Sequence, residues 1–203
     1  MTTDAVPPGE AARRARLRYE VKGTVMRGRA AALREQGWLV KVEKHLDPAT
    51  LAMVNEPPVT STWIEGARVA EIDDVVRDVL GDRVLEELAA MTVRRSIGPL
   101  LRAAVEGTLR LFGTSPATLF ARLDRLSAST VRGMSFSWET AGARGGSMTV
   151  TYPGSADVPL STFISIRAGF EGVFDMCGAK GTSRLAVRSE APPRNSGRFD
   201  ISW

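Results

Sequence analysis

The sequence contains little of the chemistry on which most metalloproteins and many enzymes depend. Its 203 residues include one cysteine, Cys177, and one histidine, His45. A single cysteine excludes an internal disulfide framework, and one cysteine plus one histidine cannot supply the ligands of a tetrahedral zinc site. We therefore expect a cytoplasmic protein with no cofactor, stabilised by its hydrophobic core alone.

Long apolar runs are also absent. No stretch approaches the roughly 18 apolar residues that indicate a membrane-spanning helix, and the first ten residues lack the apolar core of a signal peptide. The composition, with 43% apolar and 25% charged residues, is typical of an ordinary globular domain. We expect no membrane span.

The net charge of +4 is distributed unevenly along the chain. Four arginines crowd the N-terminus and account for most of the excess: Arg13, Arg14, Arg16 and Arg18. We predict that residues 1–18 form a flexible basic arm and that residues 19–203 form a single domain. The arm is either a solvated segment or a surface for nucleic acid or anionic membranes. We favour the solvated segment, so nucleic acid is not the expected partner.

Recognisable catalytic motifs are missing. His45 is the only imidazole that could act as a general base. The glycine-rich runs 142–146 and 178–181 lack the residue order of a phosphate-binding loop, and Gly145-Gly146-Ser147 is predicted in a hairpin loop rather than on a strand-to-helix turn. We predict that the protein is not an enzyme.

Two acidic pairs occur in predicted helices, Asp73 with Asp74 and Glu86 with Glu87. Adjacent residues on a helix diverge by about 100°, so the two carboxylates of each pair cannot converge on one substrate atom. The spacing predicts solvated surface charges.

His45 and Cys177 each allow two interpretations. His45 could be an axial ligand of haem iron, but its position at the end of a predicted helix favours contact with the last carbonyl groups. Cys177 is either a reactive or acylated thiol or a small apolar residue buried at a helix end. We favour the structural interpretation for both.

Helical spacing dominates the first part of the chain. After a short strand at 19–25, the patterns predict helices at about 26–36, 38–46, 48–54, 65–80, 83–95, 99–112 and 115–126. Asp47-Pro48 and Ser115-Pro116 each combine an N-cap residue with proline at the first helical position, and Gly81 ends one of these helices.

After Val131 the period changes from that of a helix to that of a strand. The pattern predicts an antiparallel hairpin at 136–152, a long helix from about 157 to Cys177, and two further strands around 185–187 and 199–203. The fold class is therefore α+β, with a helical layer packed on a small, mostly antiparallel sheet whose other face the long late helix covers.

The late helix has the strongest functional pattern. Six residues share a face within about 100° of arc: Phe163, Ile166, Phe170, Val173, Phe174 and Cys177. Arg167 falls in the same arc, with Glu171 four residues on. The face either lines a pocket for an apolar ligand, with Arg167 meeting an anionic head group, or belongs to a core in which Arg167 pairs with Glu171. The candidate pocket residues are Phe163, Arg167, Phe170, Phe174 and Cys177.

Several segments carry a family resemblance. They are, in order, Val21-Lys-Gly-Thr24, Ser61-Thr-Trp63-Ile64, Leu109-Arg-Leu-Phe-Gly-Thr-Ser-Pro116 and Asn195-Ser-Gly-Arg-Phe199-Asp-Ile-Ser-Trp203. Over residues 19–203 the chain resembles an uncharacterised myxobacterial paralogous family. That family is similar to the ligand-binding superfamily of the 4-vinyl reductase domain, the haem-based nitric-oxide sensor domain and the Bet3-type subunits of vesicle-tethering complexes.

The resemblance implies a compact α+β domain with a buried pocket between sheet and helices, used for small apolar ligands or for protein assembly. The sequence departs from the pattern of each relative. No cysteine lies near Gly197, where 4-vinyl reductase relatives carry one, and no histidine lies in 65–127, where the haem sensors carry their proximal ligand. Cys177 does not align with the acylated cysteine of the Bet3-type subunits.

These observations lead to one hypothesis and two alternatives. We expect a non-enzymatic bacterial sensory or adaptor domain that binds a small apolar ligand or docks a protein partner. The alternatives are an obligate homodimeric or hetero-oligomeric interaction subunit with a fully packed interior, and a nucleic-acid-binding protein that uses residues 1–18. If Phe170 lines a pocket, Phe170→Ala weakens ligand retention and costs less than the ~3–5 kcal/mol of a packed core phenylalanine.

Overall fold

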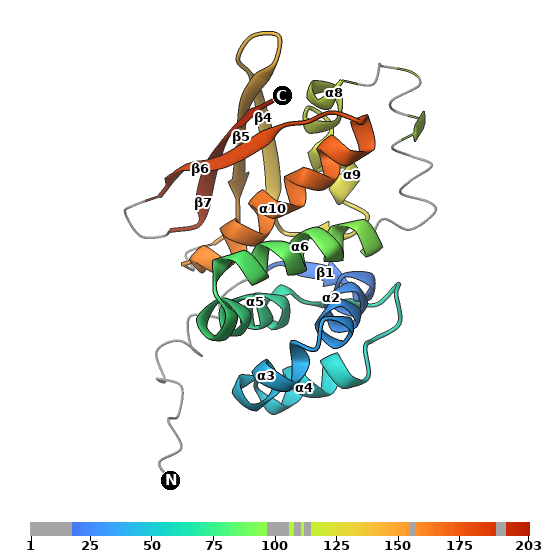
Figure 1. Ribbon diagram of the computed structural model, residues 1–203. Helices are drawn as coiled ribbons and strands as arrows, with labels where there is room; N and C mark the ends of the chain where they lie inside the picture. The colour runs from blue at the N-terminus through green and yellow to red at the C-terminus, as the bar shows by residue number, and fades with distance from the viewer. Residues whose placement is uncertain (1–17, 97–105, 108–110, 112–114, 155–156, 190–193) are drawn as a thin grey trace.

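The computed structural model describes residues 18–96, 106–107, 111, 115–154, 157–189 and 194–203. Helices dominate the first half of these residues and a sheet with one long helix dominates the second half (Figure 1). This arrangement confirms the predicted α+β class.

The first half forms a helical layer. Its elements are α2 (Gly23–Glu35), α3 (Leu39–Val42), the 3-10 helix η1 (Glu43–His45), α4 (Pro48–Asn55), α5 (Gly66–Leu80) and α6 (Asp82–Ser96). The predicted cap at Asp47 is confirmed, because its side chain accepts a hydrogen bond from the Ala49 amide and Pro48 occupies the first turn. Gly81 ends α5 with a positive φ of 88°, which favours glycine.

A small three-stranded antiparallel sheet lies beside these helices. Its strands β1 (Glu20–Lys22), β2 (Trp63–Glu65) and β3 (Val131–Arg132) have the order β2-β1-β3. The strand predicted at 19–25 is therefore shorter than expected, since α2 already begins at Gly23. An added Cβ at Gly23 would lie 2.2 Å from the Val59 carbonyl oxygen, so this close approach requires glycine.

The second half contains the larger sheet. Its elements are α8 (Pro116–Phe120), α9 (Leu123–Ser127), β4 (Ser135–Thr140), β5 (Gly145–Thr151), α10 (Leu160–Cys177), β6 (Thr182–Arg188) and β7 (Ser196–Ser202). The four strands are antiparallel in the order β4-β5-β7-β6, as the period of two predicted. Gly178 closes α10 in the left-handed conformation.

One face of the larger sheet is apolar. Trp138, Met148 and Phe199 lie opposite one another in the strand register and point to the same side. Helix α10 packs on the sheet and also on α5 and α6, so it lies between the sheet and the helical layer (Figure 1). We expected the helical layer on one face of the sheet and α10 on the opposite face, and this was wrong. The sheet has a single apolar face, so α10 packs on that face and the helical layer packs on α10.

Two predicted helices differ in detail. The helix expected at 115–126 is divided into α8 and α9, and the one expected at 38–46 is completed by a 3-10 turn. Most of the predicted helix 99–112 lies outside the described residues, as do residues 1–17 of the predicted arm.

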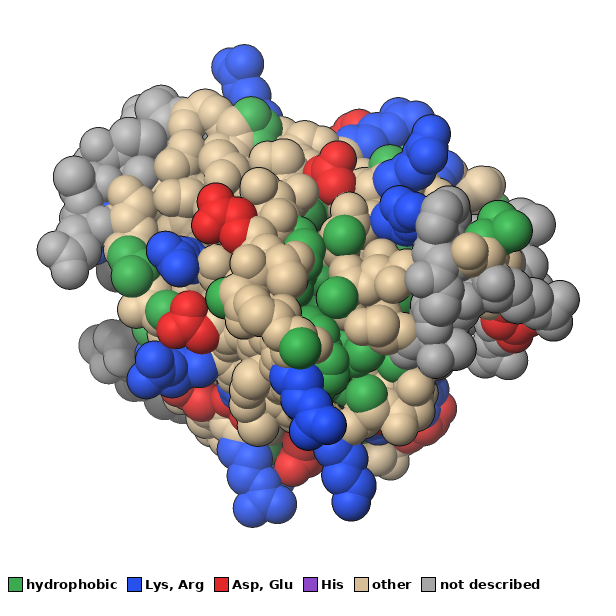
Figure 2. Space-filling model, turned by 90° about the horizontal axis from the view of Figure 1, so that it is seen from above, with side chains coloured by type: hydrophobic (Ala, Val, Ile, Leu, Met, Phe, Trp, Pro, Cys, Tyr) green, Lys and Arg blue, Asp and Glu red, His purple; other side chains and the backbone are tan. Residues whose placement is uncertain are grey.

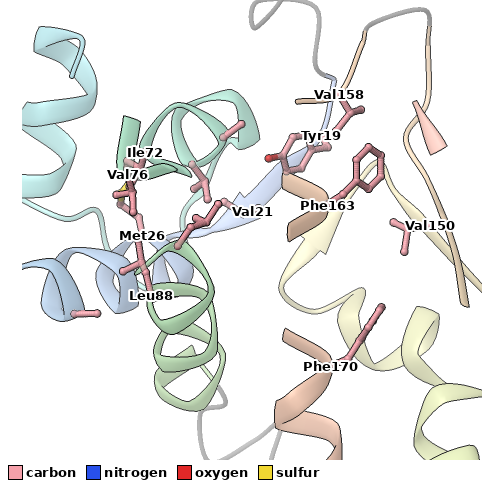
Figure 3. Packing of buried hydrophobic residues seen from close by; sticks show 14 of the residues in the cluster. Tyr19, Val21, Met26, Ile72, Val76, Leu88, Val150, Val158, Phe163 and Phe170 are labelled. Atoms are coloured by element: carbon pink, nitrogen blue, oxygen red, sulfur yellow. The ribbon is translucent and has the colours of Figure 1, made fainter. Parts of the chain in front are cut away.

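The buried side chains form a continuous core across both layers. Figure 3 shows Met26, Ile72 and Leu88 packed among α2, α5 and α6, while Phe163 of α10 faces Val150 of β5. The late helix therefore contributes to the core on its sheet side.

Candidate functional site

A cavity of about 260 Å³ lies where the two layers meet. Its lining comes from α2, α5 and α6 on one side and from α8, α9, α10 and β4 on the other. Most of the lining is apolar and includes Val25, Val69, Ala89, Leu119, Phe170 and Val173. The site is thus built from residues that are distant in the sequence.

Charged residues form a small part of the same lining. The Nη2 atom of Arg29, on α2, donates a hydrogen bond to Oδ2 of Asp73, on α5, at 2.9 Å. Ser165 of α10 donates to the same carboxylate oxygen at 2.7 Å. Arg29 is 5% exposed and Asp73 is 2% exposed, so the pair is removed from solvent. We call Arg29, Asp73 and Ser165 the polar floor of the cavity.

The protonation of Asp73 reflects this burial. Desolvation raises the pKa of the Asp73 carboxyl to about 6, and the neighbouring Arg29 and Ser165 only partly oppose the shift. Burying Arg29 and Asp73 therefore carries a substantial desolvation cost, which their attraction and hydrogen bonds must offset. The prediction that Asp73 is a solvated surface charge was wrong.

The five candidate pocket residues occupy different positions. Phe170 lines the cavity, whereas Phe163, Arg167, Phe174 and Cys177 lie outside its described lining. Phe163 and Phe174 are almost fully buried in the core beside the sheet. The helical spacing predicted one broad face for these side chains. Because α10 packs on the sheet and on α6, only part of that face lines the cavity.

Arg167 does not pair with Glu171. It forms an ion pair with Glu86 of α6 and donates a hydrogen bond to the backbone oxygen of Ser183 in β6 at 3.4 Å. Glu171 is exposed. The pairing predicted from the four-residue spacing was wrong because α6 and β6 flank this side of α10 and offer Arg167 partners outside its own helix.

The two reactive residues lie away from the cavity lining. His45 is exposed at the end of η1. Cys177 is half-buried at the end of α10, where burial raises the pKa of its thiol. A raised pKa reduces the thiolate fraction, which supports the structural interpretation of this cysteine.

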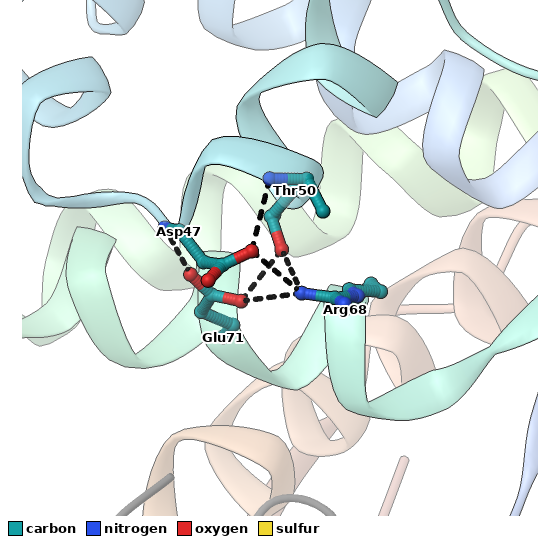
Figure 4. A network of polar contacts seen from close by, with 5 residues as sticks. Asp47, Thr50, Arg68 and Glu71 are labelled. Carbon is teal, nitrogen blue, oxygen red and sulfur yellow. Dashed lines mark hydrogen bonds and ion pairs between the residues drawn. The ribbon is translucent and has the colours of Figure 1, made fainter.

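A second polar cluster joins α4 to α5 (Figure 4). Glu71 accepts hydrogen bonds from the Asp47 amide and the Thr50 hydroxyl, both at 2.6 Å, and Arg68 donates to Asp47 at 2.9 Å. Both oxygens of the Glu71 carboxylate are therefore engaged by partners within the chain. The arrangement stabilises the packing of α4 on α5 and leaves no carboxylate oxygen of Glu71 for a substrate.

The surface shows an apolar hollow. Apolar side chains are visible at its bottom near the centre of the face seen from above, and Lys and Arg side chains project around it (Figure 2).

Among the described residues, no helix is long and apolar enough to cross a membrane, and no group of three or more His, Cys, Asp or Glu residues is placed to hold a metal ion.

No family model matches the sequence, and no curated protein matches it. Solved structures do match the fold. An oxygen-binding H-NOX domain related to soluble guanylate cyclases aligns with 11% identity and a TM-score of 0.58, covering 89% of this chain and 92% of that domain. The Fe(II) unliganded H-NOX protein from K. algicida aligns with 12% identity and a TM-score of 0.58, covering 89% and 95%.

A third match comes from work on haem redox potential and porphyrin distortion, with 11% identity and a TM-score of 0.57 over 90% of this chain and 99% of that one. At these identities the likeness shows the fold alone. The resemblance to the haem-based sensor domains is therefore confirmed at the level of the fold, while the link to a myxobacterial family stays a prediction.

The described lining of the cavity offers haem iron neither a histidine nor a cysteine ligand. Haem iron needs an axial ligand such as histidine or a cysteine thiolate, and His45 and Cys177, the only such residues of the sequence, lie outside the described lining. Tyr19 and Tyr152 do line the cavity, but burial raises the pKa of both hydroxyls and disfavours a tyrosinate ligand.

Proposed function

We propose that this protein is a non-enzymatic sensory or adaptor domain that binds a small apolar ligand in the cavity between its two layers. The cavity itself, about 260 Å³ with a mostly apolar lining, is the observation that supports the proposal. An apolar cavity of about 150 Å³ holds benzene. By proportion, this cavity accommodates a ligand of about ten non-hydrogen atoms, far smaller than a porphyrin.

The position of the cavity supports a sensory role. Because α2, α5 and α6 line one side and α8, α9 and α10 line the other, a bound ligand contacts both layers at once. A ligand that binds one relative arrangement of the layers better than another shifts the population toward it. A protein partner that binds only one of these arrangements would then bind in response to the ligand.

The described lining of the cavity contains no assembled catalytic group, which is consistent with a non-enzymatic role. The one imidazole, on His45, is exposed on η1 and is not part of the described lining. The carboxylate in the lining, Asp73, is paired with Arg29 and accepts from Ser165. Homodimer formation and a role as a scaffold subunit stay predictions.

Calorimetric titration of the full chain with 4-isopropyltoluene, a hydrocarbon of suitable size, tests the proposal. We expect one binding site per chain. Ala89, 2% exposed on α6, lines the cavity, so Ala89→Leu and Ala89→Phe should weaken binding progressively as the added side chain fills the space.

Val40 supplies the matched control. It is 74% exposed on α3 and outside the described lining, so Val40→Phe adds the same side chain without changing the cavity. We expect unchanged affinity for Val40→Phe. If the wild-type chain binds neither the hydrocarbon nor a polar molecule of the same size and shape, or if Ala89→Phe and Val40→Phe bind the hydrocarbon equally well, the proposal is wrong.

A further inference from the structure

The polar floor of the cavity has unused hydrogen-bonding capacity. Arg29 donates to Asp73 through Nη2, while its buried Nε and Nη1 atoms have no hydrogen-bond partner. Asp73 accepts twice through Oδ2, while its buried Oδ1 atom has no partner. The buried hydroxyl of Thr162, which also lines the cavity, has none either.

Such groups are uncommon in a folded interior. The large majority of buried side-chain polar atoms have a partner, and a buried group without one costs free energy. Here three residues that line one cavity, each no more than 5% exposed, carry such atoms. The pattern indicates that a molecule held in the cavity completes these hydrogen bonds.

The unpartnered atoms define what that molecule must offer. Nε and Nη1 of Arg29 are donors, so the ligand needs an acceptor, and Oδ1 of Asp73 is an acceptor, so the ligand needs a donor. A primary amide presents a carbonyl oxygen and an N–H side by side. A hydrocarbon offers neither group, and a carboxylate offers only acceptors.

Charge gives a further restriction. Arg29 and Asp73 neutralise each other at 2.9 Å, so a neutral ligand leaves the buried cluster without net charge. An anionic ligand would add an uncompensated negative charge inside an apolar cavity, which is strongly unfavourable. The remainder of the lining requires an apolar body attached to the polar group.

We propose that the ligand is a small neutral amide on an apolar body, whose carbonyl accepts from Arg29 and whose N–H donates to Oδ1 of Asp73. The inference rests on the proposed function and adds the chemical class of the ligand. It assigns Arg29 and Asp73 as specificity-determining residues, in addition to their role in joining α2 to α5.

Three probes of the same size test the assignment by calorimetric titration of the full chain at pH 7.5. They are 4-methylbenzamide, its hydrocarbon isostere 4-isopropyltoluene, and 4-methylbenzoate. An amide loses far more hydration than a hydrocarbon on entering an apolar cavity. We expect the amide nevertheless to bind at least as tightly as the hydrocarbon, and about tenfold or more tightly than the carboxylate.

The double variant Arg29→Met/Asp73→Leu removes the ion pair of the polar floor, leaves Ser165 in place and keeps the volume approximately. Replacing a buried ion pair by apolar residues is often neutral for stability, so we expect this variant to fold. Its affinity for the amide should fall by about tenfold or more, with its affinity for the hydrocarbon unchanged or higher. The comparison of the three probes on the wild-type chain is decisive even if the double variant does not fold.

The possible outcomes separate this inference from the proposed function. If the hydrocarbon binds more tightly than the amide, or the carboxylate binds as tightly as the amide, the cavity holds apolar ligands but the amide assignment is wrong. If none of the three probes binds, both the assignment and the proposed function are contradicted.

Discussion

Arg29 and Asp73 are the residues whose environment differs most from that of ordinary charged side chains. Both belong to helix faces that are otherwise buried, since Arg29 lies three residues after Met26 and Asp73 lies four residues after Val69. Their pairing joins α2 to α5 in the wall of the cavity. Protonation of Asp73 therefore affects the stability of this junction.

The raised pKa of Asp73 predicts a particular dependence of stability on pH. An aspartate in the unfolded chain has a pKa near 3.8, and burial raises the folded value to about 6. Between these values the folded state binds a proton that the unfolded state does not, so stability increases as the pH falls through 6 and is lost as the pH rises through it. From pH 7.5 to pH 5 we expect a gain of about 1 kcal/mol from this group.

Urea denaturation at the two pH values measures the effect. The variant Arg29→Met/Asp73→Leu is the reference, because it lacks the titrating group while the other carboxylates remain. The gain should appear as a difference between the wild-type chain and this reference. Equal pH dependence in the two proteins would show that the folded pKa of Asp73 is not raised.

Phe170 combines two roles that the sequence analysis separated. It lines the cavity and is also 3% exposed, with edge-on ring contacts to Phe120 at 5.6 Å and to Phe199 at 5.2 Å between centroids. These contacts are those of a packed core phenylalanine, so the expectation that Phe170→Ala has only a small effect on stability no longer holds. We expect Phe170→Ala to destabilise the fold by about 3–5 kcal/mol and also to weaken binding of 4-isopropyltoluene, because the enlarged cavity fits it poorly.

Phe163→Ala provides the comparison for this prediction. Phe163 lies on the same helix and is fully buried, but it is outside the described lining of the cavity. Urea denaturation should show a similar loss of stability for both variants, and titration should show weakened binding for Phe170→Ala only. Equal loss of binding in both would remove Phe170 from the site.

The sequence predicted some of these residues and not others, for identifiable reasons. The spacing on α10 identified Phe170 as inward-facing. Arg29 and Asp73 also occur at inward positions, but no sequence pattern singled out Arg29, and the adjacency of Asp73 to Asp74 predicted a solvated surface charge. The sequence does place an arginine and an aspartate on the apolar faces of two helices, which is a signal for a buried ion pair. This signal can be recognised only once α2 and α5 are known to be neighbours.

At the scale of elements, glycines set the distance between α6 and α10. An added Cβ at Gly169 would lie 3.4 Å from Val93 Cγ2, an ordinary contact, whereas one at Gly172 would lie 2.8 Å from Val93 Cγ1. The two positions are on the same helix and face the same valine. Alanine substitutions at these two positions therefore distinguish the effect of helix propensity on stability from the effect of close packing.

We expect Gly169→Ala to stabilise the fold by up to about 1 kcal/mol, since alanine is the better helix former. Gly172→Ala should lose that gain, because the stiff Val93 side chain must move, at a cost of about 1–3 kcal/mol. Thermal denaturation of the two variants measures the difference. A Gly172→Ala protein as stable as Gly169→Ala would contradict the close packing of the two helices.

Elements with strong local signals were predicted accurately. The caps at Asp47 and Ser115, the stop at Gly81 and the alternation in β4 and β5 each depend on residues within one or two turns. The strands β2 and β3 were not predicted as elements. With three and two residues they are too short to show a period, and they exist because the distant β1 pairs with both.

At the scale of the whole molecule, the cavity depends on how the two layers meet. Helix α10 lies between the sheet and α6 (Figure 1). It packs on the sheet through its phenylalanines and on α6 through its glycines, and residues of this helix line the cavity. The order of the layers follows from long-range packing, which the sequence pattern does not specify. For the same reason the cavity could be anticipated only in outline.

The predicted basic arm should be dispensable for the cavity. Deletion of residues 1–17 keeps Tyr19, which lines the cavity and donates a hydrogen bond to the Gly66 carbonyl. We expect this deletion to leave the affinity for 4-isopropyltoluene unchanged in calorimetric titration. A large loss of affinity would show that the N-terminal residues belong to the ligand-binding domain.

The most direct test of the account is to locate a ligand inside the protein. Crystals of the full chain grown with 4-bromotoluene allow the bromine to be located from its anomalous scattering. We expect one strong peak between the two layers, within about 4–5 Å of Leu119 or Phe170. Side chains that fill this space, or bromine found only on the surface, would contradict the proposed ligand-binding cavity.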